Sequence, residues 1–330
     1  MKCFFSGLLF IVAASTTQAS FYTFDEWTRE FRITFRDMKH QVSVYEKWLT
    51  NDKYITQINS LNLTYALGHN HFSGMDSDDF RGYLGYSAPV VSVGDSLVVD
   101  SANSLESVDW VKRGAVTPVK DQGQCGSCWS FSTTGALEGA YFVAYGKLES
   151  FSEQQLVDCD TLRNGGRDHG CNGGLMDNAF SWIEKNGGLC IESEYPYVSG
   201  VTKTAGTCQT SCSVYSGSAI KNFVDVSPSS DDAMMNALSK QPVSIAIQAD
   251  QKDFQLYKSG VFTGACGVNL DHGVLAVGYG SLDGVDYYKV KNSWSVSWGQ
   301  QGYILLGRGA EYNNGDGQCG MLLSGSYPTV

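Results

Sequence analysis

The sequence has no basic patch and no polybasic run, and charged residues of either sign are scarce. Only 17% of its 330 residues are charged, and the formal net charge is −11. This balance excludes a protein that binds nucleic acid through electrostatic attraction. Because 42% of the residues are hydrophobic, the composition also excludes an intrinsically disordered chain. A chain of this length is expected to form two or three structural units.

Long apolar runs are missing as well. The longest lies near the N-terminus, where residues Phe4 to Ala14 follow Lys2 and precede the small residues Thr17 and Ala19. This pattern is typical of a secretory signal peptide, which we place at residues 1–19. No later stretch approaches the ~20 apolar residues that a membrane helix needs, so we expect a soluble product that does not insert into a membrane.

Cysteine is absent between Cys3 and Cys125. Over this cysteine-free region, apolar residues recur every three or four positions from Phe24 to Ile58, which predicts a long amphipathic helix broken once. Residues 87–104 are rich in Ser, Val and Asp without a regular pattern, as in an exposed, cleavable linker. The region 20–104 is therefore predicted to be an N-terminal segment that is distinct from the rest of the chain and can be removed by cleavage in the linker.

The cysteines beyond the linker are odd in number. Passage through the secretory route makes disulfides available, so at least one thiol must stay unpaired within the chain. An unpaired thiol in a secreted protein is either a liability or the active group. The cysteines concerned are at positions 125, 128, 159, 171, 190, 208, 212, 266 and 319.

Residues 105–330 begin with predicted helices and continue with predicted strands. Helices are predicted at about 128–145, where Gly146 is a plausible stop, and at about 152–158, 174–186 and 230–240. After Pro242 the runs VSIAIQA, GVLAVGYG, YYKVKNSW and GYILLGRG are short, β-rich and bounded by glycine. We therefore expect a helical domain at about 105–215 and a strand-dominated domain at about 216–330.

Histidine is scarce, which narrows the search for a general base. Of five histidines, only His169 and His272 lie beyond the linker. His169 belongs to a polar, glycine-rich turn and is interpreted as a solvated loop residue. His272 stands at the head of an apolar strand, where a side chain can be held rigidly beside a cleft.

The pair Cys125-Gly126-Ser127-Cys128 has several interpretations. A zinc site would need a second closely spaced pair, and a redox dithiol would need a βαβ surround; neither is present. The alternative is a nucleophile at Cys128, the first residue of the predicted helix 128–145. Helix N–H groups and the helix dipole stabilise an anion there, so the thiol pKa should fall and thiolate should form near neutral pH.

Three ordered blocks resemble the papain family of peptidases, in particular cathepsin L and the plant vacuolar members. The first is Gln122-Gly123-Gln124-Cys125-Gly126-Ser127-Cys128-Trp129-Ser130-Phe131, preceded by AVTPVK. The second is Asp271-His272-Gly273, and the third is Lys291-Asn292-Ser293-Trp294. The histidine follows the cysteine within the roughly 130–150 residues expected of papain-like enzymes. One departure is Ser295, where the family usually has glycine.

The resemblance implies an α+β fold of two domains with the active site in the cleft between them. It implies Cys128 as nucleophile, His272 as acid and base, and Asn292 as the amide that orients the imidazole. Gln122 and the Cys128 backbone N–H would form the oxyanion hole, and Trp294 would shield the His272–Asn292 hydrogen bond. The implied reaction is peptide-bond hydrolysis through a thioester, with no metal or organic cofactor.

The resemblance also implies a substrate-binding set and a disulfide set. Met176, Ala246, Leu270, Gly273 and Ser324 would surround the substrate side chain second from the scissile bond, with Gly173, Gly174 and Trp294 also at the cleft. Implied disulfides are Cys125–Cys171, Cys159–Cys208 and Cys266–Cys319. Pairing the extra Cys190 with Cys212 leaves Cys128 free, although an exchange of Cys208 with Cys212 stays open.

The N-terminal segment resembles the cathepsin L-type inhibitory propeptide. Trp48, Asn51, Ile55 and Asn59 fall on its helix motif, but His40 and Val44 stand where glutamate and arginine are usual, and Gly74 replaces an aspartate. Asn62-Leu63-Thr64 is a glycosylation sequon. We expect this segment to inhibit the chain's own peptidase.

Expected partners are protein and peptide substrates and cystatin-like inhibitors, with neither nucleic acid nor membrane. The expected location is the secretory pathway, ending in a lysosome or vacuole or outside the cell. The rival interpretation is a secreted, non-catalytic binding protein on the same scaffold. Such a protein would be signalled by Ser or Gly at position 128, and the sequence has cysteine there.

Overall fold

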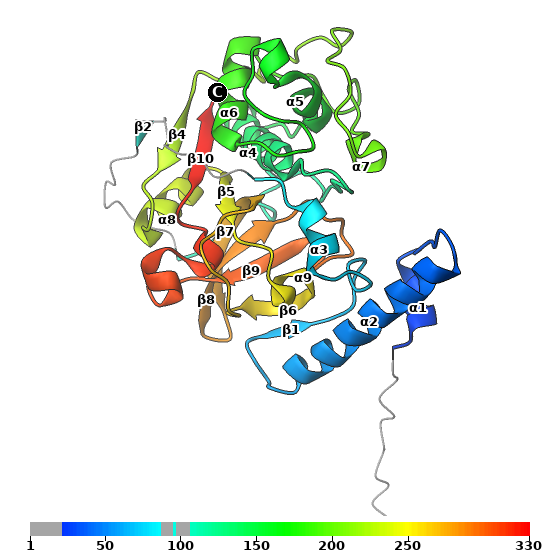
Figure 1. The fold of residues 1–330 in the computed structure, drawn as a ribbon. Coiled ribbons are helices and arrows are strands. Elements are labelled where there is room, and N and C mark those ends of the chain that lie inside the picture. The colour runs from blue at the N-terminus through cyan, green and yellow to red at the C-terminus, as the bar shows by residue number, and fades with distance from the viewer. Residues whose placement is uncertain (1–21, 87–94, 97–105) are drawn as a thin grey trace, which may run out of the picture.

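The structure, a computed structural model, describes residues 22–86, 95–96 and 106–330 (Figure 1). The expected signal peptide and nearly all of the expected linker lie outside these residues. No helix within the described ranges is both long enough and apolar enough to cross a membrane.

Two helices open the described chain. α1 (Phe24–Glu30) starts with a capping box, because the Thr23 hydroxyl accepts the Glu26 N–H and the Glu26 carboxylate accepts the Thr23 N–H. α2 (Met38–Asn59) is capped by Asp37, whose carboxylate accepts the His40 N–H. The helix expected over 24–60 is thus broken once, as predicted. Trp27, Trp48, Asn51 and Ile55 are its buried side chains.

The chain then runs from α2 along the rest of the molecule. β1 (Tyr65–Leu67) pairs antiparallel with β6 (Tyr257–Phe262), so the N-terminal segment adds a strand to the edge of the main sheet. α3 (Ser77–Phe80) and the 3₁₀ turn η1 (Arg81–Tyr83) follow and lead toward the junction between the helices and the sheet (Figure 1).

The helical part is built around α4 (Cys128–Tyr145). Nearly every side chain from Cys128 to Tyr141 is buried, because α5 and α6 cover one side of α4 and strands β5, β7 and β10 lie against another. The helix ends at Gly146, whose φ of 68° is left-handed, as expected for a glycine C-cap. The other helical elements here are α5 (Glu153–Cys159), η2 (Leu162–Asn164), α6 (Met176–Asn186) and α7 (Ser199–Thr202).

The strands form one largely antiparallel sheet in the order β1-β6-β9-β8-β7-β5-β10-β4-β2, with β3 paired to β7. Its centre is β7 (His272–Leu282), which lies between β5 (Val243–Ile247) and β8 (Val285–Lys291). The remaining strands are β2 (Asp95–Ser96), β3 (Val108–Asp109), β4 (Asn222–Val226), β9 (Tyr303–Gly307) and β10 (Gly325–Thr329). Shorter elements around the sheet are α8 (Asp231–Lys240), α9 (Lys252–Gln255), η3 (Tyr312–Gly315) and η4 (Gln318–Gly320).

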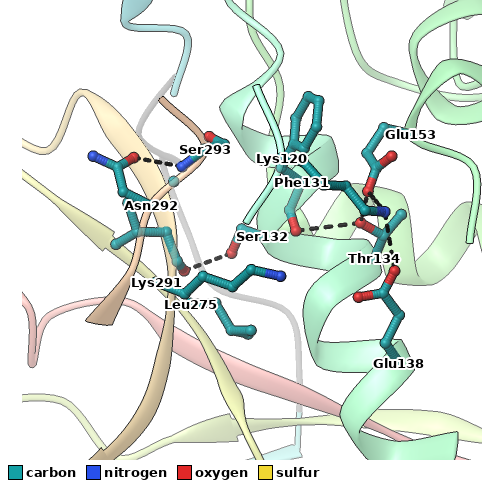
Figure 2. A pocket seen from close by; sticks show the side chains of 12 residues that line it. Lys120, Phe131, Ser132, Thr134, Glu138, Glu153, Leu275, Lys291, Asn292 and Ser293 are labelled. Carbon is teal, nitrogen blue, oxygen red and sulfur yellow. Dashed lines mark hydrogen bonds and ion pairs between the residues drawn. The ribbon is translucent and has the colours of Figure 1, made fainter. Parts of the chain in front are cut away.

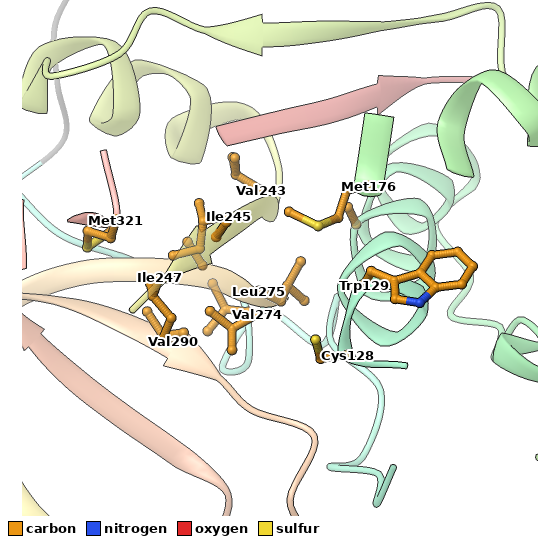
Figure 3. Close-up of a cluster of buried hydrophobic side chains, with 14 of the residues drawn as sticks. Cys128, Trp129, Met176, Val243, Ile245, Ile247, Val274, Leu275, Val290 and Met321 are labelled. Carbon is orange, nitrogen blue, oxygen red and sulfur yellow. The ribbon is translucent and has the colours of Figure 1, made fainter. Parts of the chain in front are cut away.

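The helical and strand parts meet where α4 crosses β7 (Figure 3). Leu275 of β7 lies directly against Gly135, where an added Cβ would come within 2.8 Å of a Leu275 methyl. The Ser132 hydroxyl donates to the Val274 carbonyl at 2.7 Å, which ties the two elements together. The first residues of α4 and β7, Cys128 and His272, are thereby brought to the same end of the junction.

Four disulfides connect the part of the chain that the structure describes. They are Cys125–Cys171, Cys159–Cys208, Cys190–Cys212 and Cys266–Cys319. The alternative exchange of Cys208 with Cys212 is thus not the one that the structure adopts. Among the cysteines of the described residues, only Cys128 is unpaired.

Candidate active site

The thiol of Cys128 lies at the first turn of α4, fully buried. Its sulfur accepts the backbone N–H of Gly273 at 3.3 Å. Because Gly273 follows His272 in β7, this bond places the thiol beside the start of that strand. The N-terminal end of a helix also favours negative charge on the sulfur.

The imidazole of His272 is held from one side by an amide. Its Nε2 lies 2.8 Å from Oδ1 of Asn292, the residue that follows β8. Since the amide oxygen can only accept, Nε2 must carry the proton. The Trp294 indole stacks on the imidazole, with ring centroids 4.4 Å apart. Nδ1 of His272 is buried without a hydrogen-bond partner, so it is the nitrogen left for proton exchange.

Gln122 is held by the third sequence block. Its Oε1 accepts the Ser293 hydroxyl at 2.6 Å, and its backbone N–H donates to the Ser293 carbonyl. Its side-chain N–H group donates to the carbonyls of Cys125, at 3.0 Å, and Tyr83, at 2.8 Å. Tyr83 belongs to the N-terminal segment, so a carbonyl of that segment occupies the donor that the sequence predicts for the oxyanion hole.

Residues 83–86 cross between the two parts of the molecule at this point. The Gly85 carbonyl accepts the Gly174 N–H at 3.0 Å on the helical side, and the Tyr86 N–H donates to the Asp271 carbonyl at 3.0 Å on the strand side. The Gly85 N–H faces the Cys128 sulfur. The N-terminal segment therefore bridges the cleft directly over the thiol.

This cover changes the electrostatics of the thiol and the imidazole. Burial raises the pKa of Cys128 to about 11 and lowers the pKa of His272 to about 4, because both charged forms lose their hydration. The lowered thiol pKa expected from the helix start is therefore wrong for the covered chain: desolvation outweighs the helix N–H groups. In this state the pair is a neutral thiol and a neutral imidazole.

The residues predicted around the substrate side chain are connected to Tyr86 through a series of neighbours. A Cβ on Gly273 would lie 3.2 Å from the Met176 sulfur, and Ala246 faces Gly273 across the strand pair. The Ala246 N–H donates to the Ser324 carbonyl, and the Ser324 hydroxyl lies 2.9 Å from the Tyr86 hydroxyl. The Leu270 side chain lies against Gly320.

The other predicted cleft residues take different places. Gly174 pairs with Tyr86 in an isolated bridge, and Gly173 beside it has a φ of 107°, a conformation that favours glycine. Trp294 is fully buried beneath Phe72 and Phe80 of the N-terminal segment. In the structure the Trp294 ring contacts His272, this cover, and the rings of Phe254 and Trp298 in the strand part.

Sequence reasoning missed three features of this region. Ser293 orients Gln122, and the only signal for it is its position between Asn292 and Trp294. The segment after Gly68 is expected to cover and thread the cleft, but nothing in the sequence marks Tyr83 to Tyr86 as the residues that cross it. Asp177 lies near the end of the Tyr86 pocket, where its carboxylate accepts the Ser326 hydroxyl at 2.6 Å and adds to the raised pKa of Tyr86.

A buried cluster of charged side chains lies behind the site (Figure 2). Lys120 contacts Glu138 at 3.1 Å and Glu153 at 2.5 Å. Lys291, the residue before Asn292, donates to the Thr117 hydroxyl at 3.0 Å, which ties the end of β8 to the helical part. A cavity of about 20 Å³ remains among these side chains, enough for one water molecule.

Ser295, the departure from the usual glycine, lies in the loop after Trp294. Its φ of 67° is left-handed, which costs a non-glycine residue roughly 1–2 kcal/mol. Its N–H donates to the Lys120 carbonyl at 3.1 Å. The loop therefore keeps the conformation that glycine would adopt, at some cost in stability.

The described residues gather no group of three or more His, Cys, Asp or Glu side chains that could hold a metal ion. The chemistry available from the side chains present is that of a thiol, an imidazole fixed by an amide, and amide N–H donors. Such a set can attack an acyl carbon, carry a proton and stabilise an oxyanion.

Comparison with known proteins agrees with this geometry. Residues 105–329 match the family described as papain family cysteine protease, and residues 24–80 match the cathepsin propeptide inhibitor domain. The chain is 42% identical over 315 residues to cysteine protease XCP2 of Arabidopsis thaliana, covering 93% of this chain and 85% of that protein. It is 39% identical over 335 residues to the senescence-specific cysteine protease SAG39 of Oryza sativa subsp. japonica, covering 99% and 96%.

Solved precursor structures are similar along most of their length. The recombinant stem bromelain precursor superposes with a TM-score of 0.82 at 38% identity, covering 93% of this chain and 97% of that chain. The digestive procathepsin L 3 of Tenebrio molitor larval midgut has a TM-score of 0.82 at 33% identity, with coverages of 93% and 97%.

The chain belongs to the papain family of cysteine proteases and has the papain-like α+β fold preceded by a helical propeptide. It is a cysteine peptidase made as a zymogen, and its own propeptide is the inhibitory domain. Residues 22–86 are therefore called the propeptide below. The family resemblance, the fold class and the zymogen form expected from the sequence are confirmed.

Proposed function

We propose that this chain is an endopeptidase in which Cys128 is the nucleophile and His272 the acid and base. The Cys128 thiolate attacks the carbonyl carbon of the scissile bond, and the C–N bond breaks as His272 protonates the leaving amine. Water, deprotonated by His272, then hydrolyses the thioester and releases the acid. The observation that carries this proposal is the Cys128 sulfur beside Gly273, with the His272 imidazole fixed by Asn292.

Asn292 and Gln122 have supporting roles in this proposal. Asn292 keeps the imidazole in one orientation by accepting from Nε2, and Trp294 keeps water from that hydrogen bond. The Gln122 side-chain N–H and the Cys128 backbone N–H stabilise the oxyanion. The Gln122 donor is bound to the Tyr83 carbonyl in the precursor, so the same group serves inhibition first and catalysis after the propeptide leaves.

We propose that the enzyme acts in a lysosome or vacuole or outside the cell, after cleavage within residues 87–104. Four disulfides support passage through the secretory pathway. Its partners are protein and peptide substrates and, as further candidates, cystatin-like inhibitors.

Acid should release the propeptide. Burial lowers the pKa of His71 to about 4 and lowers that of His69, while backbone N–H groups and Lys47 lower the pKa of Asp76. All three groups bind protons less tightly in the folded precursor than in the unfolded chain. Precursor stability is therefore lost as pH falls, between about 6.5 and 4 for the histidines and below about 4 for Asp76. We expect processing to accelerate across this range.

Substitution of His71 is the most direct test of this pH dependence of processing. The His71 side chain faces a cavity also lined by Arg32, His40 and Lys203, so its protonation would add charge beside two cations and a second histidine, with Asp79 as the one acidic group in the same lining. Precursors can be incubated at each pH and then assayed at one common pH. His71→Gln should need a pH lower by at least about half a unit to process at the wild-type rate. Asp78→Asn, at an exposed pair with Arg81, is the control; equal profiles for His71→Gln and wild type would contradict the role of His71.

Substrate preference follows from the pocket beside Gly174. Met176, Ala246 and Gly273 offer no charge, and in the precursor burial raises the pKa of Asp177 to about 6, above the assay pH of 5. An arginine side chain there would be buried without an anionic partner, whereas Phe or Leu gains about 1.5–3 kcal/mol. At pH 5 we expect kcat/KM for peptides with Phe or Leu second from the scissile bond to exceed that for Arg by about one to two orders of magnitude.

The matched gain-of-function variant for this preference is Ser324→Glu. Glutamate at that position supplies the missing anion, so the variant should cleave the Arg peptide better than the wild type does. Equal or better cleavage of the Arg peptide by the unaltered enzyme would show that the pocket is wrongly assigned.

A further inference from the structure

Two buried aspartates lie behind the wall of the cleft on the helical side. Asp160 is the C-cap of α5 and is fully buried, and Asp168, in the loop before α6, is 2% exposed. The Asp168 N–H donates to the Asp160 carbonyl at 3.1 Å, so the two residues are neighbours in space. Neither of them belongs to the catalytic groups proposed above.

The contacts of the two carboxyl groups require a proton between them. Oδ1 of Asp160 accepts the Arg167 N–H at 3.0 Å. Oδ1 of Asp168 accepts the Leu175 N–H at 3.1 Å and the Asn178 side-chain N–H at 2.9 Å. Oδ2 of each aspartate is buried and meets no other N–H or O–H donor among the described residues, while the two side chains are within hydrogen-bonding reach of each other. An ionised carboxylate can only accept, so one carboxyl group of the pair must carry a proton.

The surroundings of the pair favour this shared proton. Burial raises the pKa of both carboxyl groups, and the Asp160 charge raises the pKa of Asp168 further. Lys185 of α6 acts on the pKa of Asp160 in the opposite direction, but more weakly than burial does. The other ionisable groups around the pair lie at the end of α5 and in the loop after it, and they are Asp158, Arg163 and His169. The pair therefore keeps one proton well above pH 4, where an isolated aspartate loses it.

This pair is joined to the part of the cleft wall that meets the backbone of the propeptide. Asp168 holds the N–H of Leu175, the residue directly after Gly174. A Cβ on Gly174 would lie 2.8 Å from the Asp168 carboxyl carbon, so the carboxyl group packs against Gly174 itself. The Gly174 N–H donates to the Gly85 carbonyl of the propeptide. Once the propeptide leaves, the same N–H is open to a carbonyl of the substrate.

We propose that Asp168 is a positioning residue: a proton shared with Asp160 holds Gly174 where it binds the backbone of the substrate. This inference rests on the proposed function. When the proton leaves, two carboxylates repel each other in a buried site, Asp168 withdraws from the Leu175 N–H, and Gly174 loses its support. The folded chain binds one more proton at this pair than the unfolded chain does. The stability that the pair contributes therefore falls as the pH rises from about 4 to about 9.

Asparagine is the matched replacement, because its amide supplies permanently the N–H that the shared proton supplies only while it is bound. The test compares melting temperatures between pH 6 and pH 8 in Cys128→Ala precursors, which do not process themselves. Relative to this parent, Asp168→Asn should gain about 2–3 °C per pH unit. Asp160→Asn should gain as much, since either carboxyl group can hold the proton. Glu184→Gln, at an exposed site on α6, removes one negative charge as well and should follow the parent.

Kinetics of the processed enzyme test the positioning role. Asp168→Ala removes both the shared proton and the contact with Leu175, so KM for a fluorogenic peptide should rise at least about threefold, with a smaller change in kcat. Asp168→Asn should restore most of the loss in KM, which a change of packing alone would not explain.

The outcomes separate the two proposals. Melting that depends on pH as in the parent, in both asparagine variants, overturns the shared proton. A KM for Asp168→Ala equal to that of the wild type, or one that asparagine does not restore, overturns the positioning role. Failure of the processed wild type to cleave any peptide would instead overturn the proposed peptidase site.

Discussion

Replacing Cys128 with alanine is expected to lower kcat/KM for peptide hydrolysis by at least about four orders of magnitude. The reason is that no other described thiol is free: every other cysteine in those ranges is in a disulfide. Without the sulfur there is no covalent route, and the Gln122 donor and the binding pocket can supply only residual acceleration. Measurement of kcat/KM on the processed variant with a fluorogenic peptide gives the result directly.

The same substitution should leave the fold intact. The Cys128 sulfur accepts the Gly273 N–H and faces the Gly85 N–H, and each such hydrogen bond costs about 1 kcal/mol when lost. The variant precursor should therefore unfold within a few degrees of the wild type, and this thermal measurement is the control for misfolding. Because Cys128→Ala cannot process itself, its propeptide must be removed by an added protease. Residual hydrolysis above about 1% of wild type in a folded, processed variant would refute the nucleophile.

Replacing Gly85 with alanine is expected to make the precursor active without cleavage. A Cβ at Gly85 would lie 2.0 Å from the Gly126 carbonyl oxygen, a separation that no packing adjustment of side chains can relieve. Gly126 cannot move away easily, because its neighbour Cys125 is bonded to Cys171 and its own N–H donates to the Cys171 carbonyl. The propeptide must therefore lift from the thiol.

The control for this variant is present three residues earlier. Gly82 has open space at its Cβ position, so Gly82→Ala changes the same propeptide segment without a clash. Initial rates of linker-intact precursors at neutral pH, checked by gel before and after the assay, should rise about 10- to 100-fold for Gly85→Ala, because the clash costs a few kcal/mol of propeptide binding. They should stay at the wild-type level for Gly82→Ala. If the linker-intact Gly85→Ala precursor showed no activity above the wild-type precursor, the propeptide would not be in contact with Gly126.

Local signals were sufficient for much of the fold. The helix of 128–145 ends at Gly146 as expected, because a glycine C-cap acts within one turn. The break in the N-terminal helix falls just before Asp37, which caps α2 through its own side chain. The odd cysteine count and the three motif blocks indicate the same residue, Cys128. They agree because a cysteine can act as a nucleophile only if its thiol is not in a disulfide.

Features that depend on distant contacts could not be predicted in the same way. Tyr83 to Tyr86 inhibit because they meet Gln122, Gly174 and Asp271, which lie far along the chain. The pKa of Cys128 is raised because burial of the thiol outweighs the backbone N–H groups that face it, one of which comes from Gly85 of that segment. The choice between Cys208 and Cys212 as the partner of Cys159 likewise depends on where the chain returns beside α5.

Labelling with an epoxide inhibitor that alkylates active thiols, followed by peptide mapping, tests the central claim most directly. That claim is that Cys128 is the nucleophile and that residues 83–86 keep it covered and neutral in the precursor. The processed enzyme should carry one label, on the peptide that contains Cys128, in step with loss of activity, while the linker-intact precursor at neutral pH should stay unlabelled. A label on any other residue, or rapid labelling of the intact precursor, would contradict it.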